Sequence, residues 1–140
     1  MRYTIEMNDH KLYEYLDREL EKLAMLWSIE EGLFGFYQLN ENINHYSFLT
    51  SLNKYLILYD LLREVLFEGL ATLEEFTDAH LTTKVKDVDL VETFLIIDNP
   101  RSWDLNSQPT YSLCLTSKGE EYMDRHPDKL RQLEERSKMY

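Results

Sequence analysis

The sequence predicts an α+β chain that is mostly helical and carries one small antiparallel hairpin. Tyr111, Leu113 and Leu115 alternate along residues 110–115, as in a half-buried strand, and the chain turns into a helix from Thr116. Upstream, Gly69 is placed to stop one helix just before Thr72 is placed to start another. With 140 residues, of which 44% are hydrophobic, the chain is long enough for a single core.

The first half of the chain reads as two long helices. Residues 2–7 alternate as a short strand or extended arm, and Asn8 or Asp9 then caps a helix over residues 9–31 that Gly32 ends. This helix has an apolar stripe at helical spacing, formed by Leu12, Leu16, Leu20, Leu23 and Trp27. Residues 33–39 form an apolar connection, residues 40–44 a polar loop, and residues 47–68 the second helix.

A short third helix is expected after Gly69. Thr72 and Glu75 have the spacing of a capping box, in which each side chain accepts from the other residue's free backbone N–H. The helix would run over residues 72–81 and turn Leu73, Phe76 and Leu81 towards the core.

Residues 82–98 are ambiguous between helix and strand. Asp87 or Asp89 is placed to cap a helix over residues 90–95, with Val91, Phe94 and Leu95 inward, which gives way to a strand at 94–98. The β-branched and aromatic composition of residues 91–97 fits a strand equally well. A hairpin loop over 101–109 then leads to the return strand 110–115, followed by helices over 120–125 and 127–138.

This order of elements resembles the winged helix-turn-helix domain of PadR and MarR type bacterial regulators over residues 47–123. The resemblance rests on Gly69, Thr72, Glu74, Glu75 and Phe76 at the first helix junction, and on Tyr111, Leu113, Leu115, Thr116 and Gly119 in the second wing strand and the helix after it. It implies a segment 1–44 with a helix that serves dimerisation, a winged-helix domain 45–123 and a C-terminal helical segment 124–140. The apolar stripe also allows the alternative that the first helix only covers its own core.

The resemblance implies a DNA-binding regulator, but the residues in the expected recognition helix favour another partner. Lys84, Lys86 and Arg101 would have to contact DNA, while Asp87, Asp89 and Glu92 in the same region repel phosphate. We therefore expect a non-catalytic regulator or inhibitor that binds a protein partner, with a dimeric DNA-binding transcriptional regulator as the alternative. Asp87, Asp89, Glu92 and Trp103 are the candidate partner-binding residues; Trp103 either packs back on the sheet or anchors the partner.

Charge and composition favour the same interpretation. The net charge of −11 is concentrated in residues 1–81, which have 6 Lys and Arg against 15 Asp and Glu, and such a surface suits a basic partner. No two histidines are spaced to share a metal ion on one helix, and no glycine-rich loop is present to hold phosphate, so we expect no cofactor and no catalysis. Cys114 lies on the strand face opposite Tyr111, Leu113 and Leu115, as a packed or surface residue. With this single cysteine and no export signal, the cytoplasm is the expected compartment.

Overall fold

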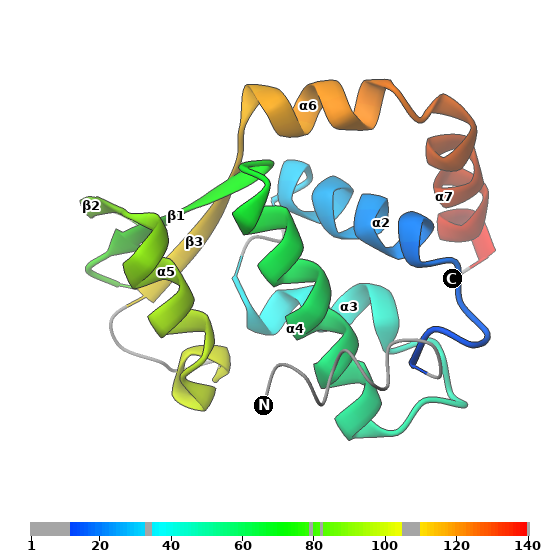
Figure 1. Cartoon of the computed structure of the whole chain (residues 1–140), viewed down its shortest axis with the longest axis horizontal. Helices are drawn as coiled ribbons and strands as arrows, with labels where there is room; N and C mark the ends of the chain where they lie inside the picture. Colours follow the sequence, from blue (N-terminus) through cyan, green and yellow to red (C-terminus); the bar gives the residue numbers. More distant parts are fainter. Residues whose placement is uncertain (1–11, 33–34, 79, 82, 105–109, 140) are drawn as a thin grey trace.

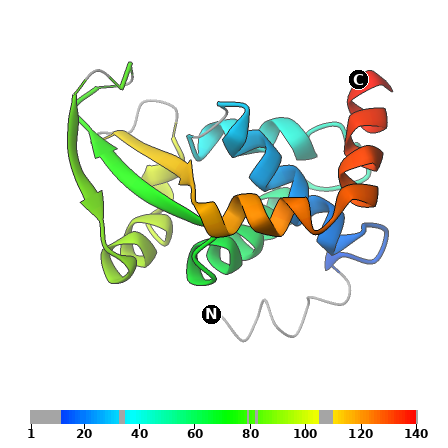
Figure 2. The same cartoon turned by 90° about the horizontal axis from the view of Figure 1, so that it is seen from above.

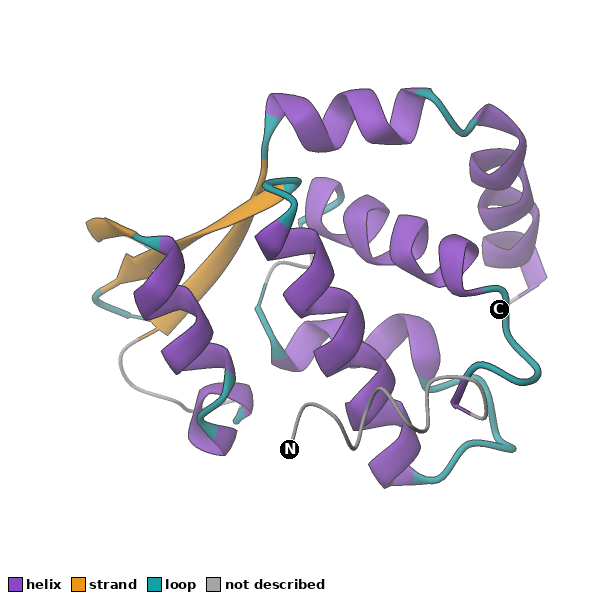
Figure 3. Ribbon diagram, in the orientation of Figure 1, coloured by secondary structure: helices purple, strands orange, loops and turns teal. Residues whose placement is uncertain are grey.

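The computed structural model describes residues 12–32, 35–78, 80–81, 83–104 and 110–139, which form an α+β arrangement of helices around one end of a small sheet (Figures 1 and 3). In chain order the elements are α2 (Arg18–Glu30), η1 (Tyr37–Leu39), α3 (Asn40–Ile43), α4 (Ser51–Phe67), β1 (Ala71–Phe76), β2 (Lys84–Val88), α5 (Leu90–Ile97), η2 (Pro100–Trp103), β3 (Thr110–Leu115), α6 (Ser117–Asp124) and α7 (Pro127–Met139). The α+β class predicted from the sequence is confirmed. None of the described helices is long and apolar enough to cross a bilayer.

Helices α2 and α4 supply the centre of the core. Leu23 and Leu26 of α2 and Ile57 and Leu62 of α4 are completely or almost completely buried. The buried apolar side chains form one cluster that extends from Leu12 to Leu133 on α7, so the three predicted segments share a core. The division at residues 44 and 123 stays a prediction.

The start of α2 differs from the expected start of a helix over residues 9–31. Residues 13–16 form a turn, and Asp17 caps the helix by accepting from the backbone N–H of Leu20 at 3.2 Å. Asn8, Asp9 and the arm 2–7 lie outside the described residues. The predicted end is confirmed, because Gly32 has a φ of +97° just beyond the C-cap Glu31.

Helix α4 follows the same pattern. It begins after Thr50, whose hydroxyl accepts from the N–H of Asn53 at 3.1 Å, rather than at residue 47. Its end is confirmed, since Gly69 has a φ of +74° and its N–H donates to the carbonyl of Leu66.

The sheet corrects the expected helix-turn-helix. Residues 71–76 form strand β1 instead of opening a helix over 72–81, and residues 94–97 belong to α5 instead of a strand. The strand order is β2-β1-β3 with both pairs antiparallel, so β3 pairs with β1, with Leu73 opposite Leu113, and not with residues 94–98. The first of the two motifs that carried the winged-helix resemblance, Gly69 to Phe76, therefore continues as a strand and not as a helix, and the finer fold assignment is not confirmed.

The C-terminal elements are those predicted, but the helix expected over 120–125 is α6, which begins already at Ser117. Strand β3 has the predicted bounds, and the hydroxyl of Thr116 caps α6 by accepting from the N–H of Gly119 at 3.0 Å. The same hydroxyl donates to the carbonyl of Gly69 at 2.7 Å, and the N–H of Thr116 donates to the carbonyl of Leu70 at 3.0 Å. The two sequence motifs, around Gly69 and around Thr116, thus lie against each other. Pro127 begins α7.

Candidate interaction surface

Helix α5 is placed beside the sheet by a short connection. Asp89 follows β2 directly, and its carboxylate caps α5 by accepting from the N–H of Glu92 at 2.8 Å, which confirms one of the two predicted caps. Thr93 and Ile97 are buried, so the helix turns Val91 and Leu95 outward. The expectation that Val91 and Leu95 face the core is wrong, because Thr93, Ile96 and Ile97 hold the inner face.

Exposed apolar side chains consequently lie on α5, and Val85 of β2 is exposed as well. The exposed fractions are 50% for Val85, 46% for Leu90, 75% for Val91 and 68% for Leu95. We define the β2–α5 surface as these four residues together with the acidic Asp87, Asp89 and Glu92. It lies at the end of the molecule opposite α7 (Figure 1). Tyr15, before α2, and Phe48, before α4, are also exposed and have ring centroids 6.1 Å apart, and Leu52 in the first turn of α4 is exposed too.

The candidate DNA contacts Lys84 and Lys86 lie on strand β2, and both form ion pairs. Lys84 Nζ lies 2.7 Å from Glu74 and 2.6 Å from Asp87, and Lys86 Nζ lies 2.9 and 3.0 Å from the two oxygens of Glu92. The hydrogen bond to Glu92 raises the pKa of Lys86 above its usual value. These ammonium groups therefore have local carboxylate partners that a phosphate backbone would have to displace.

The other candidates are separated or used internally. Arg101 lies in η2, beyond the opposite end of α5 from the two lysines. Trp103 packs its ring against Phe36 and Tyr55, each at a centroid distance of 5.2 Å, and its indole N–H donates to the carbonyl of Ile97 at 2.9 Å. Trp103 therefore packs back on the protein, against Phe36 just before η1 and Tyr55 of α4 rather than on the sheet, and these contacts disfavour it as a partner anchor.

Cys114 lies on the predicted face of β3. It is opposite Thr72 in the register, and its thiol donates to Glu74 Oε1 at 3.0 Å. Partial burial, and then the adjacent carboxylate, raise the pKa of Cys114 to about 11, so the thiol is protonated at neutral pH and is a poor nucleophile.

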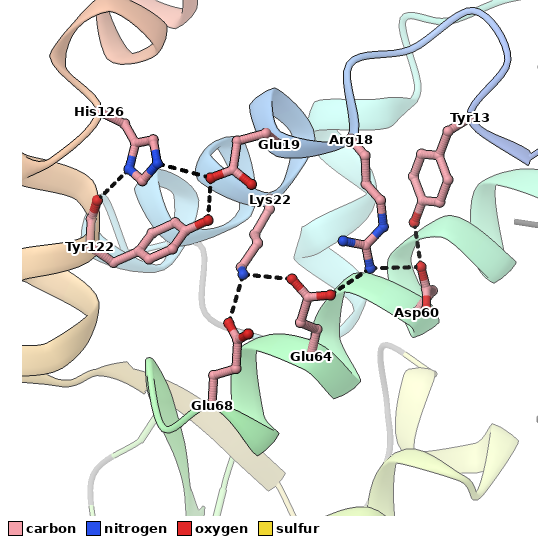
Figure 4. Close-up of polar contacts among 9 residues, drawn as sticks. All are labelled: Tyr13, Arg18, Glu19, Lys22, Asp60, Glu64, Glu68, Tyr122 and His126. Atoms are coloured by element: carbon pink, nitrogen blue, oxygen red, sulfur yellow. Dashed lines mark hydrogen bonds and ion pairs between the residues drawn. The ribbon is translucent and has the colours of Figure 1, made fainter. Parts of the chain in front are cut away.

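A second polar region joins α2 to α4 (Figure 4). Lys22, whose side chain is only 4% exposed, lies between Glu64 at 2.5 Å and Glu68 at 2.7 Å. Arg18 extends this row, at 2.7 Å from Glu64 and 3.1 Å from Asp60. Burial alone would lower the pKa of Lys22, but the hydrogen bonds to Glu64 and Glu68 outweigh it and raise the pKa.

These four-residue spacings were present in the sequence. Arg18 and Lys22 recur on one face of α2, and Asp60, Glu64 and Glu68 on one face of α4. Sequence reasoning missed the pairing because it used only the apolar positions of the two helices. The five residues form what we call the α2–α4 ion-pair cluster, in which each basic side chain lies between two carboxylates.

A neighbouring contact joins α2 to the junction of α6 and α7 (Figure 4). His126 places Nδ1 2.7 Å from the carbonyl of Tyr122 and Nε2 3.1 Å from Glu19 Oε1, and the Tyr122 hydroxyl donates to the same Glu19 oxygen. Burial, and then this hydrogen bond, raise the pKa of Tyr122 to about 12. Glu19 of α2 therefore contacts both the end of α6 and the residue just before α7.

Among the residues described, no group of three His, Cys, Asp or Glu side chains is placed to hold a metal ion. Comparison of the chain with protein-family models, with curated proteins and with solved structures gives no match.

Proposed function

We propose that the chain is a non-catalytic acidic protein that regulates or inhibits a protein partner through the β2–α5 surface. The proposal rests on one observation: a short strand and the helix that follows it carry four apolar side chains, between 46% and 75% exposed, and three carboxylate residues. Large exposed apolar groups bordered by charge are typical of protein-binding sites. The carboxylates suit a partner with a basic surface, because complementary charge speeds encounter and sets orientation.

Site-specific photo-crosslinking tests this proposal. A benzophenone side chain at Val91 or Leu95 on α5, in cells that naturally contain the protein, should give one dominant crosslinked partner with a basic contact region. The matched control places the same group at the exposed positions Glu134 and Glu135 on α7. Crosslinking to the same proteins from α5 and α7 would contradict the proposal, because the β2–α5 surface would then have no preferred partner.

The alternative function is DNA binding through Lys84, Lys86 and Arg101. The ion pairs of Lys84 and Lys86 disfavour it, and we expect no duplex binding tighter than the non-specific range of roughly 10⁻⁴ to 10⁻⁶ M at physiological salt. Fluorescence anisotropy with a random duplex measures this directly. A nanomolar, salt-sensitive complex that is lost in Lys84→Ala and Lys86→Ala would favour DNA binding over the protein partner.

The homodimer stays a prediction, but the apolar stripe of α2 that was expected to form its interface packs against the core of its own chain. Leu23 of the α2 stripe is buried in its own chain, and Leu16, Leu20 and Trp27 are half-buried against the same core. Sedimentation equilibrium that gives the chain mass of 16.9 kDa would reject the dimer.

A further inference from the structure

Within the part of the chain that the structure describes, strand β2 is an edge of the sheet. Among the described strands it pairs only with β1, while Figures 1 and 2 show its other side at the margin of the molecule. Residues 84–87 are exposed, and only Val88 at the end of the strand is buried. An edge strand presents alternate backbone N–H and C=O groups to solvent, and these groups can pair with an added strand.

The usual protection of an edge by lysine is weak here. Lysine discourages strand addition because its charge must be desolvated, and β2 carries Lys84 and Lys86. Both charges are already compensated by Glu74, Asp87 and Glu92. With Asp89, four carboxylates lie beside two ammonium groups, so the edge carries a net negative charge.

Helix α5 offers an apolar contact next to this edge. Lys86 on β2 forms an ion pair with Glu92 on α5, so the side of α5 that carries Glu92 lies next to β2. Leu95 follows Glu92 by three residues and thus lies beside it on the helix surface, with a 68% exposed side chain. The side chain of Asp87 is 82% exposed. It points to the face of the sheet away from Lys86, because neighbouring residues of a strand alternate between the two faces.

We propose that β2 accepts an extended segment of a basic partner as a fourth strand of the sheet. Alternate apolar side chains of this segment lie on Leu95 and Val91, and the intervening Lys or Arg side chains lie on the Asp87 face. The inference rests on the proposed function, and it specifies the partner as a strand with alternating apolar and basic residues. Backbone pairing supplies affinity in this mode, and the two faces supply specificity.

Three peptides with the same set of side chains test the pairing with the full chain. The first is acetyl-Lys-Val-Lys-Val-Lys-Val-Lys-amide, the second is the permuted acetyl-Lys-Lys-Val-Val-Lys-Lys-Val-amide, and the third is the first peptide with N-methyl groups on its central Val-Lys-Val. Nuclear magnetic resonance titration and amide hydrogen exchange on the ¹⁵N-labelled protein are the measurements. The alternating peptide should slow exchange of the outward amides among residues 84–88 at least tenfold, and the other two should bind at least tenfold more weakly.

Charge-reversal variants distinguish failure of the strand from failure of the surface. Asp87→Lys with Glu92→Lys should weaken the alternating peptide at least tenfold, while the matched change Glu134→Lys with Glu135→Lys on α7 should weaken it less than threefold. Equal binding of all three peptides, sensitive to Asp87 and Glu92 but without protection of β2, would overturn strand addition and leave the protein-binding surface in place. Equal weakening by both double variants, or binding by none of the peptides, would overturn both.

Discussion

Replacement of Lys22 by methionine tests whether the α2–α4 ion-pair cluster holds the two central helices together. The substitution keeps the length of the side chain and its position near the Tyr122 ring, where Lys22 Nζ lies 4.5 Å from the centroid, but removes the charge. Breaking a buried ion pair from one side usually costs about 3–5 kcal/mol, because the remaining charge is left without a partner.

The structure places the expected loss below that range. Glu64 keeps Arg18 at 2.7 Å, and the side chain of Glu68 is 43% exposed and can recover water. We therefore expect the free energy of unfolding to fall by about 2–3 kcal/mol, with a decrease in Tm of roughly 8 °C for a chain of this size. Urea and thermal denaturation followed by circular dichroism measure both quantities.

The pH dependence of this loss of stability follows from the pKa of Glu64. Burial alone would raise the pKa of Glu64, but hydrogen bonds from Arg18 and Lys22 outweigh it, so the folded-state pKa lies below the unfolded value. The contribution of the cluster is therefore present above the unfolded pKa and is lost as pH falls through the folded pKa. The difference in stability between wild type and Lys22→Met should shrink from pH 5 downward.

The matched control is Lys84→Met, which removes an ammonium group from an exposed pair with Glu74 and Asp87. It should leave Tm unchanged within error, because exposed ion pairs contribute little. A Lys22→Met protein as stable as wild type, or a loss that is independent of pH between 3 and 6, would refute the account of the cluster.

Three further substitutions or measurements test local features. Asp89→Ala should cost about 1 kcal/mol of unfolding free energy through loss of the α5 cap, and Asp89→Asn should restore most of it. Gly119→Ala should cost about 2 kcal/mol or more, since its Cβ would lie 2.1 Å from the carbonyl oxygen of Leu70 and force apart the junction of β3 and α6. Cys114 should react slowly with dithionitrobenzoate at pH 7.5 and faster in Glu74→Gln, because its raised pKa keeps it a thiol; fast reaction in the wild type would contradict that environment.

Helix ends were predictable because their signals are local. The glycines at positions 32 and 69 adopt positive φ where a helix must stop, and the Thr116 side chain satisfies the free N–H of Gly119 in the first turn of α6. Such signals need no knowledge of the rest of the chain. The starts of α2 and α4 were placed too early because Asp17 and Thr50, the caps actually used, lie inside segments whose apolar spacing already looked helical.

The identity of β1 was not predictable from the same local signals. Thr72 and Glu75 fit a capping box, but they also fit a strand in which Ala71 and Leu73 point inward. Pairing with Cys114 and Tyr111 on β3 decides between them. That pairing joins residues about forty positions apart, and it overrides a weak local propensity because it buries Leu73 and satisfies the backbone groups of both strands.

The candidate surface shows how charge must be interpreted together with geometry. The sequence suggested that carboxylates near Lys84 and Lys86 oppose DNA by facing phosphates from a recognition helix. In the structure these lysines lie on an edge strand and are held by Glu74, Asp87 and Glu92, so the opposition arises from ion pairs that a phosphate must break. The same pairing lowers the barrier to an added strand, because it compensates the charges that otherwise protect a sheet edge. A count of charges cannot separate these effects, because both depend on which carboxylate each ammonium group contacts.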